Sequence, residues 1–283
     1  MSVSETNPTL AVPFIRIEPA SNSLTLRLKE LWEYRELLYF LVWRDVKVRY
    51  KQTAIGAAWA IIQPLLTMAI FTLVFDRFAK MPSNGLPYPI FSFAALLLWT
   101  YFSRSLNQSI ISVVNNANLI TKVYFPRLLL PIAATLAGII DLAISFVFLL
   151  GMMIWYGITP GWAILTLPVF VLLTILTALS VSFWLAEIDV RDRDVGQAIP
   201  FLVQIWMFVS PVAYPVSVVP EKWRLLYNLN PMAGAIEGFR WAVTGSEDPP
   251  FLAILLSVII VGALLYSGIL FFKRMEHTFA DEV

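Results

Sequence analysis

Few residues in this chain of 283 amino acids could carry out chemistry. It has no cysteine and a single histidine, His277, which excludes thiolate metal sites, a cysteine nucleophile and a Ser-His relay. The phosphate-binding loop G-x-x-x-x-G-K-[ST] is also missing, because no Gly-Lys dipeptide occurs. We therefore expect no catalytic residue, no metal site and no cofactor bound by this chain.

Four carboxylates lie close together in the run Glu-Ile-Asp-Val-Arg-Asp-Arg-Asp, residues 187–194. Such a cluster could hold a cation, but calcium loops also need backbone carbonyls at fixed turns and a glycine hinge. The nearest glycine, Gly196, lies beyond the cluster, and arginines alternate with the acids. We interpret the run as the polar boundary between two helices rather than as a metal site.

The elements that position these groups are apolar helices. The chain is 59% hydrophobic and only 14% charged, whereas a soluble domain carries about 25% charged residues. A helix crosses the hydrocarbon core with about 20 apolar residues, and windows of that kind occur at about 54–77, 88–111, 128–155, 162–186, 195–218 and 250–272. The sequence predicts an all-α polytopic membrane protein with six transmembrane helices in a permease domain over residues 54–283.

The distribution of basic residues predicts the orientation of these spans. Placing the N-terminus in the cytoplasm puts 14 Lys and Arg on the inner side and five on the outer side. Both termini are then cytoplasmic. Residues 1–23 form a polar tail without the apolar region of a signal peptide. Net charge near +1 gives no attraction to nucleic acid, and we expect none as a partner.

Residues 24–53 are predicted to form an amphipathic helix on the inner membrane surface. Leu31, Leu38 and Leu41 share one face at helical spacing, and Glu33, Arg44 and other charged residues occupy the opposite face. Aromatic residues along its flank suit the headgroup level of the membrane lipid. The helix is interpreted as a membrane anchor, with docking of a cytoplasmic protein on its charged face as the alternative.

Two further segments lie between spans. Residues 112–127 form a polar cytoplasmic loop that is longer than a simple helix connection and ends at Pro126. Residues 220–250 form two short helices broken at Asn230-Pro231. Such a pair indicates a re-entrant outer hairpin before the last span, and irregular backbone at that depth requires contact with protein or a water-filled cavity. The hairpin indicates a passage near the fifth span.

Apart from Asp76 and Arg77 at the end of the first window, the ionisable residues within the spans are limited to Asp141 and Arg104, too few for a proton relay. Asp141 is interpreted as a helix–helix contact. Aromatic residues are numerous in the spans. They either pack between the helices or form a wall whose rings stack on the apolar faces of sugars. The architecture thus indicates a transport subunit that takes its energy from another protein.

Several motifs occur in an order that resembles one family. They are Arg49-Tyr50-Lys51-Gln52-Thr53 with Gly56, Trp59 and Gln63-Pro64; Lys122 to Arg127; Arg191-Asp192 with Asp194; Ser210 to Pro215; and Asn230-Pro231 through Arg240. The chain resembles the membrane (permease) subunit of type-2 ABC exporters of lipid-linked polysaccharides, the Wzm-like group of O-antigen, capsule and teichoic-acid permeases. The resemblance covers about residues 27–275.

The resemblance implies a homodimer that binds two copies of a nucleotide-binding ATPase subunit, in which ATP and Mg are held by that partner. It implies a multi-pass protein of the bacterial inner membrane that moves a polyprenyl-diphosphate-linked glycan outward. The implied site residues are the following: for coupling to the ATPase Asn115, Asn116, Asn118 and Lys122; for the pore wall Trp59, Phe71, Phe201, Trp206, Phe208 and Tyr214; for the lipid headgroup Arg49 and Lys51; and for the outer gate Trp223, Tyr227, Pro231 and Arg240.

Two alternatives stay open at this point. A permease of the same fold could export a drug or a small lipid. From a different class, a membrane enzyme could act on polyprenyl-linked sugars, and such an enzyme would be active when purified alone.

Overall fold

The computed structural model describes residues 28–51, 58–159, 161–192, 194–245 and 248–275. Every regular element within these ranges is a helix, which confirms the all-α class for the described part of the chain. The predictions made for the tail 1–23, for residues 52–57 at the start of the first span, and for Arg193 and His277 lie outside these ranges.

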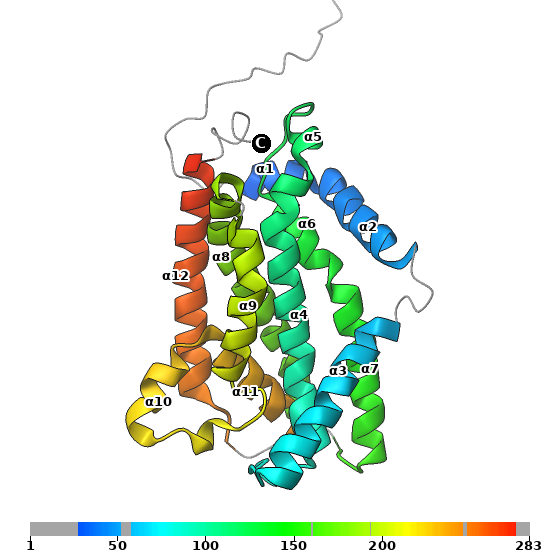
Figure 1. Cartoon of the computed structure of the whole chain (residues 1–283), viewed down its shortest axis with the longest axis vertical. Helices are drawn as coiled ribbons and strands as arrows, with labels where there is room; N and C mark the ends of the chain where they lie inside the picture. The colour runs from blue at the N-terminus through cyan, green and yellow to red at the C-terminus, as the bar shows by residue number, and fades with distance from the viewer. Residues whose placement is uncertain (1–27, 52–57, 160, 193, 246–247, 276–283) are drawn as a thin grey trace, which may run out of the picture.

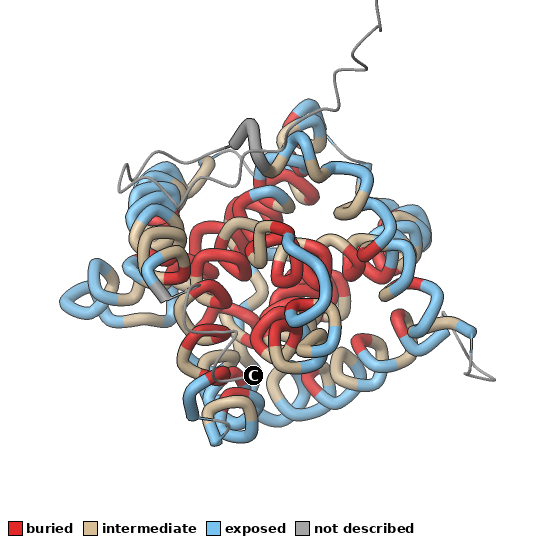
Figure 2. The backbone as a smooth tube through the Cα atoms, turned by 90° about the horizontal axis from the view of Figure 1, so that it is seen from above, coloured by how far each residue is buried: buried red, intermediate tan, exposed pale blue. Residues whose placement is uncertain are grey.

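The helix α4 (Tyr88–Asn115) is the centre of the bundle (Figure 1). Its long buried face combines aromatic, aliphatic and serine side chains, which lets other helices approach closely. The helices that pack against it are α3 (Trp59–Phe71), α6 (Leu129–Ala137), α7 (Ile139–Trp155), α8 (Leu167–Arg191), α9 (Asp194–Phe208) and α11 (Pro231–Thr244). Figure 2 shows the buried residues gathered in the middle of this arrangement.

The last helix, α12 (Phe251–Met275), packs on α8 and α11 at one side of the bundle. The rings of Trp184 and Phe271 stack 4.5 Å apart across the contact with α8. On its other side α12 exposes a row of aliphatic residues, each half or more exposed: Leu252, Leu255, Val258 and Ile259. Contiguous apolar surface of this kind is unfavourable in water, so this side of α12 faces lipid.

Four helical segments of the described chain are long and apolar enough to cross a membrane: Trp59–Phe78, Leu129–Trp155, Trp162–Arg191 and Phe251–Arg274. They coincide with the first, third, fourth and sixth predicted spans. The first consists of α3 and the π-helical turns of η2 (Thr72–Phe78), and the fourth of η3 (Trp162–Thr166) and α8. The other two predicted spans correspond to α4, which is more polar, and α9, which has only 15 residues. For α4 and α9 the crossing stays a prediction.

The third predicted span bends at Gly138, between α6 and α7. A Cβ atom at this position would lie 2.9 Å from the Ser105 hydroxyl and 3.1 Å from the Tyr101 ring. Glycine therefore allows the close approach of α7 to α4, one turn before Asp141.

The N-terminal helices α1 (Leu28–Glu33) and α2 (Arg35–Lys51) lie at the end of the bundle that carries the short helix α5 (Ala117–Ile120) (Figure 1). Leu41 and Val46 of α2 are buried, and α2 runs along α6. The rings of Trp32 in α1 and of Tyr39 and Trp43 in α2 are exposed. A helix that buries one side on protein and exposes aromatic rings on the other fits an interfacial position.

At the opposite end, α9 is followed by an irregular stretch that contains η4 (Val216–Val218), then by α10 (Glu221–Asn228) and α11. The side chain of Asn230 caps α11 by accepting a hydrogen bond from the Met232 amide at 3.1 Å. Gly245, with φ +66°, ends the helix in the left-handed conformation. Almost every residue of α11 is buried between α4, α8 and α12.

Candidate functional site

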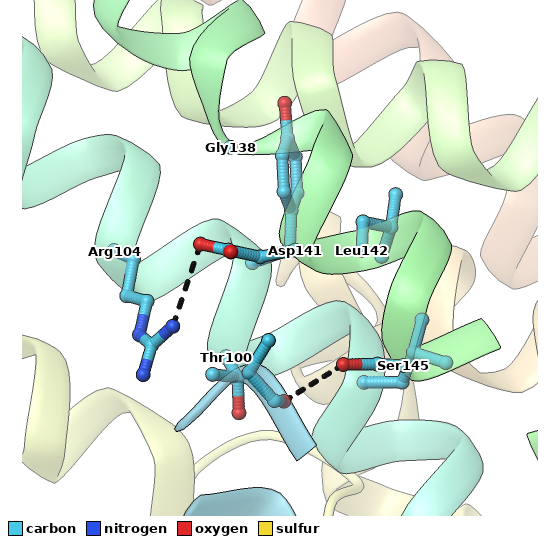
Figure 3. Close-up of a pocket in the computed structure, with 9 residues that line it drawn as sticks. Thr100, Arg104, Gly138, Asp141, Leu142 and Ser145 are labelled. Atoms are coloured by element: carbon cyan, nitrogen blue, oxygen red, sulfur yellow. Dashed lines mark hydrogen bonds and ion pairs between the residues drawn. The ribbon is translucent and has the colours of Figure 1, made fainter. Parts of the chain in front are cut away.

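A cluster of charged residues lies inside the bundle, around Asp141 of α7 (Figure 3). The Asp141 carboxylate accepts hydrogen bonds from the Arg49 guanidinium at 2.6 Å, from the Tyr50 hydroxyl, and from Arg104 at 3.5 Å. Arg104 also donates to the side-chain carbonyl of Gln63. We call these five residues the Asp141 cluster; they come from α2, α3, α4 and α7.

The Asp141 cluster joins α2 to α3, α4 and α7. An ionised carboxylate is costly in the apolar interior unless it is paired, and Asp141 is only 8% exposed. Burial, and then the hydrogen bond to Asp141, raise the pKa of Tyr50 to about 12, so the phenol stays a donor. One turn further along α7, Ser145 donates to the Ala60 carbonyl of α3 at 2.8 Å. The end of α2 and the start of α3 are thus fixed to α7 by polar contacts.

The cluster contains two guanidiniums and one carboxylate, so one positive charge is not neutralised within it. The Arg49 and Arg104 side chains keep 27% and 31% of their surface exposed. Of the two residues predicted to contact a headgroup, Arg49 is therefore held by Asp141, and Lys51 is exposed at the last position of α2.

The helix α9 presents a mixed polar and aromatic face that other described residues do not cover. Gln197, Phe201, Gln204 and Phe208 are all exposed and follow each other at spacings of four, three and four residues, which is one face of a helix. Ile199 and Val203 are buried on the opposite side. A side-chain amide that faces hydrocarbon loses its hydrogen bonds at a cost of about 1–3 kcal/mol. The glutamines thus indicate that this face of α9 meets water or another polar surface.

The structure divides the six predicted pore aromatics into two groups. Trp59, Phe201 and Phe208 are 47%, 65% and 53% exposed. Phe71 is buried in the core, and the Trp206 ring packs edge-on against Phe102 at 5.1 Å.

Trp206 also donates from its indole nitrogen to Asn230 at 3.0 Å, which links α9 to the cap of α11. Tyr214 is half-buried and donates to the Phe208 carbonyl at 2.8 Å. The exposed group is accessible to a ligand, whereas Phe71 and Trp206 hold the helices together.

In the irregular stretch that follows α9, side chains donate hydrogen bonds to backbone carbonyls that no helix pairs. Arg240 of α11 donates to the carbonyls of Phe91 at 3.0 Å and Val212 at 2.8 Å, and to Glu237 at 3.0 Å. Burial raises the pKa of the Glu237 carboxyl, and the Arg240 guanidinium opposes that rise. Arg240 therefore acts as a buried strut that fixes the irregular stretch to α4 and α11.

The other residues predicted for the outer gate lie on α10 and at the start of α11. Pro231 is buried at the first position of α11, where its missing N–H costs nothing. Trp223 is 54% exposed on α10, and the Tyr227 ring lies 6.3 Å from the Tyr214 ring. Trp223 is the member of this set most open to contact from outside the chain.

The predicted coupling residues lie on and around α5. Asn116 accepts a hydrogen bond from Arg44 of α2 at 2.8 Å and donates to the Ser112 carbonyl at 2.7 Å. Asn115, Asn118 and Lys122 are exposed. The loop is thus attached to α2 through Asn116 and leaves its remaining polar residues accessible.

Comparison with known proteins identifies the family. A model of the ABC-2 type transporter family matches residues 36–244, which contain α4, α9 and the loop around α5. The chain belongs to this family. As an ABC-2 membrane protein it is a multi-pass transporter component, and the family typically works with a separate ATPase subunit.

Several curated relatives are similar over most of their length. The O-antigen export system permease protein RfbA of Myxococcus xanthus is 29% identical over 257 residues, covering 90% of this chain and 98% of the relative. A protein of the same name from Klebsiella pneumoniae is 24% identical, covering 87% and 94%. The polysialic acid transport protein KpsM of Escherichia coli is 21% identical, covering 71% and 78%.

Sequence analysis interpreted Asp141 as a helix–helix contact, and its hydrogen bonds to α2 and α4 confirm this. It did not identify Arg49, Tyr50 and Gln63 as the residues that complete the cluster. It also missed Gln197 and Gln204. Their spacing of seven, with Phe201 between them and Phe208 four residues further on, is a signal visible in the sequence that could have indicated a polar face on the fifth span. Within the described residues no group of three or more metal-ligating side chains comes together.

Proposed function

We propose that the chain is the channel-forming permease of an ATP-driven exporter. Its cargo is a polysaccharide linked to polyprenyl diphosphate, moved from the cytoplasm across the bacterial inner membrane. The observation that carries the proposal is an exposed amide-and-aromatic face on α9, Gln197 to Phe208. Relatives named as O-antigen export permeases point to the same class of cargo.

The chemistry of this face suits a sugar polymer. Aromatic rings stack on the apolar C–H faces of sugars, and side-chain amides both donate and accept hydrogen bonds with hydroxyls. Neither contact demands one particular hydroxyl pattern, which a conduit for a long glycan requires. Trp59, Phe201 and Phe208 would supply the rings, and we retain Phe71, Trp206 and Tyr214 as their packed support.

A single copy leaves this face open on one side, so the passage needs a second copy. We infer a homodimer with α3 and α9 of each copy along the axis, and two ATPase subunits on the cytoplasmic side. Asn115, Asn118 and Lys122 would receive the motion of the ATPase, which binds ATP and Mg, and Asn116 would pass it to Arg44 of α2. In this orientation both termini are cytoplasmic and α2 lies at the inner headgroup level.

The two ends of the passage have distinct roles. The unneutralised positive charge of the Asp141 cluster and the exposed Lys51 suit the diphosphate of the cargo, which would approach from the inner leaflet. The hairpin of α10 and α11 would form the outer gate. Trp223, Tyr227 and Pro231 would belong to its moving part, and Arg240 to its anchor.

Reconstitution tests this function. The tagged chain would be purified from native membranes with its associated proteins, and ATP hydrolysis and glycan transfer would be measured in inside-out vesicles. We expect a co-purifying ATPase and ATP-dependent protection of the glycan from an external glycosidase. Glycan modification by the chain alone would instead support the enzyme alternative. Transport of a small amphiphile without transport of glycan would support the drug or small-lipid permease.

A further inference from the structure

The first predicted span changes its winding at the end of the bundle that lies opposite α5 (Figure 1). There the α-helix α3 continues directly into η2, a π-helix of seven residues. The Ala79 amide at its end donates to the Val74 carbonyl, five residues earlier, at 2.9 Å. π-Helices are rare, mostly a single turn long, and frequent at functional sites. Seven residues of π-helix at the end of a span therefore indicate a role beyond spanning.

Side-chain packing fixes only one side of η2. Phe71 is buried, and its ring contacts the Phe75 ring edge-on with 5.2 Å between the centroids. Phe75 in turn packs on the main core. The other side chains from position 73 onward are exposed: Leu73, Val74, Asp76, Arg77 and Phe78. Because few contacts depend on the π-helical winding, η2 can change its winding while Phe75 keeps its place.

The backbone at both ends of η2 departs from regular geometry. Lys80 adopts φ +50°, in the left-handed region that a residue with a Cβ atom enters only at a cost. At the start of η2, the Thr72 hydroxyl donates to the Met68 carbonyl at 2.8 Å, and such a bond often bends a helix. Strain in a sparsely packed segment indicates an element that has more than one stable form.

The two windings place the exposed residues differently around the helix axis. A π-helix closes its hydrogen bonds over one residue more than an α-helix, which gives about 82° per residue instead of about 100°. Counted from Phe75, Phe78 then lies about 114° away around the axis in the π-helix and about 60° away in an α-helix. Arg77 lies about 160° away in both. Rewinding thus turns Phe78 toward the packed side of the span and leaves Arg77 exposed.

We propose that η2 is a winding switch, which exchanges between this π-helix and an α-helix during the transport cycle. The exchange moves the Phe78 ring between the exposed side of the span and the side that Phe75 packs on the core. In the proposed homodimer, with α3 along the axis, it would change the width of the outer end of the passage. That last consequence rests on the proposed function.

Thiol labelling in different nucleotide states tests the exchange. The chain has no cysteine, so Phe78→Cys and Arg77→Cys each introduce a unique thiol. A charged, membrane-impermeant methanethiosulfonate would be added to right-side-out vesicles that contain the intact transporter, without nucleotide or with ATP and vanadate inside. Arg77→Cys is the matched control, because its place around the axis is the same in both windings.

We expect the thiol at position 78 to react at least about tenfold more slowly in the state that turns it toward the core, the effect of one unit in thiol pKa. The thiol at position 77 should react at the same rate in both states. Equal changes at the two positions would indicate movement of the whole span and would overturn the switch. Unchanged labelling at both positions would overturn it as well.

Deletion of Asp76 tests whether export needs the exchange. Removing this residue takes away the extra residue of the π-helical turn, so only the α-helical winding remains. We expect glycan export to fall at least about tenfold, because the second form is then less than a tenth populated. Asp76→Ala removes the same charge without shortening the chain, and deletion of Pro82 shortens the next loop by one residue. Equal export by all three variants at equal protein level would overturn the switch.

The outcomes separate the winding switch from the proposed function. Glycan export with labelling that is the same in every nucleotide state would overturn the switch and leave the proposed function standing. Labelling at position 78 that changes with nucleotide, in vesicles that move a small amphiphile and no glycan, would support the switch and contradict the proposed function.

Discussion

Replacing Asp141 by Asn tests whether the Asp141 cluster fixes the end of α2 to α4 and α7. Asparagine keeps the size of the side chain and an acceptor for Tyr50 but removes the only carboxylate of the cluster. The guanidiniums of Arg49 and Arg104 then lie close together without a counter-charge. We expect the folded chain to be destabilised and the end of α2 to detach from α7.

The magnitude follows from the burial of the three groups. Removing one partner of a fully buried ion pair costs about 3–5 kcal/mol. Asp141 is 11% exposed at its side chain, but Arg49 and Arg104 are 27% and 31% exposed, so water screens part of the remaining charge. We therefore expect a loss of about 2–3 kcal/mol, which corresponds to a Tm lower by about 5–10 °C in a protein of this size.

Thermal unfolding of the chain in lipid nanodiscs measures this effect. Ser145→Ala is the matched control, because it removes a neutral hydrogen bond between α7 and α3 and should cost about 1 kcal/mol. The double change Asp141→Asn with Arg104→Gln returns the cluster to one positive charge and should recover part of the loss. A Tm for Asp141→Asn as high as that for Ser145→Ala would refute the role of the cluster.

The remaining predictions concern the passage, the coupling loop and the strut. Phe208→Ala should slow glycan export at an unchanged protein level. Trp206→Ala should instead lower the unfolding free energy by about 3–5 kcal/mol and so reduce the protein level. Equal protein levels of the two variants, measured by immunoblot, would contradict this division. Lys122→Glu should leave ATP hydrolysis running while export falls, because it reverses a charge on the exposed coupling loop; normal export in vesicles would contradict the coupling role. Arg240→Lys should lower the unfolding free energy by about 2–4 kcal/mol, because lysine cannot donate to three acceptors in a plane. An unchanged Tm would contradict the role of Arg240 as a strut.

Composition and hydropathy were sufficient to identify the class of the protein. A chain with several long apolar windows inserts into a membrane. Because lipid offers no hydrogen bonds to the backbone, these windows form helices. The helix break at Asn230-Pro231 was also predicted correctly, since α11 begins at Pro231 with Asn230 as its cap. These features depend on residues that are neighbours in sequence, so their physics is local.

The faces and partners of the helices were decided by the tertiary structure alone. The sequence placed Phe71 and Phe201 in the same aromatic set, but one is buried and the other exposed, because helical periodicity does not state which face a neighbour covers. The partners of Asp141 could not be named from the sequence because one of them, Arg49, lies 92 residues earlier in the chain. Only the packing of α2, α4 and α7 brings these charges together, and it does so because an unpaired charge in the bundle would be too costly.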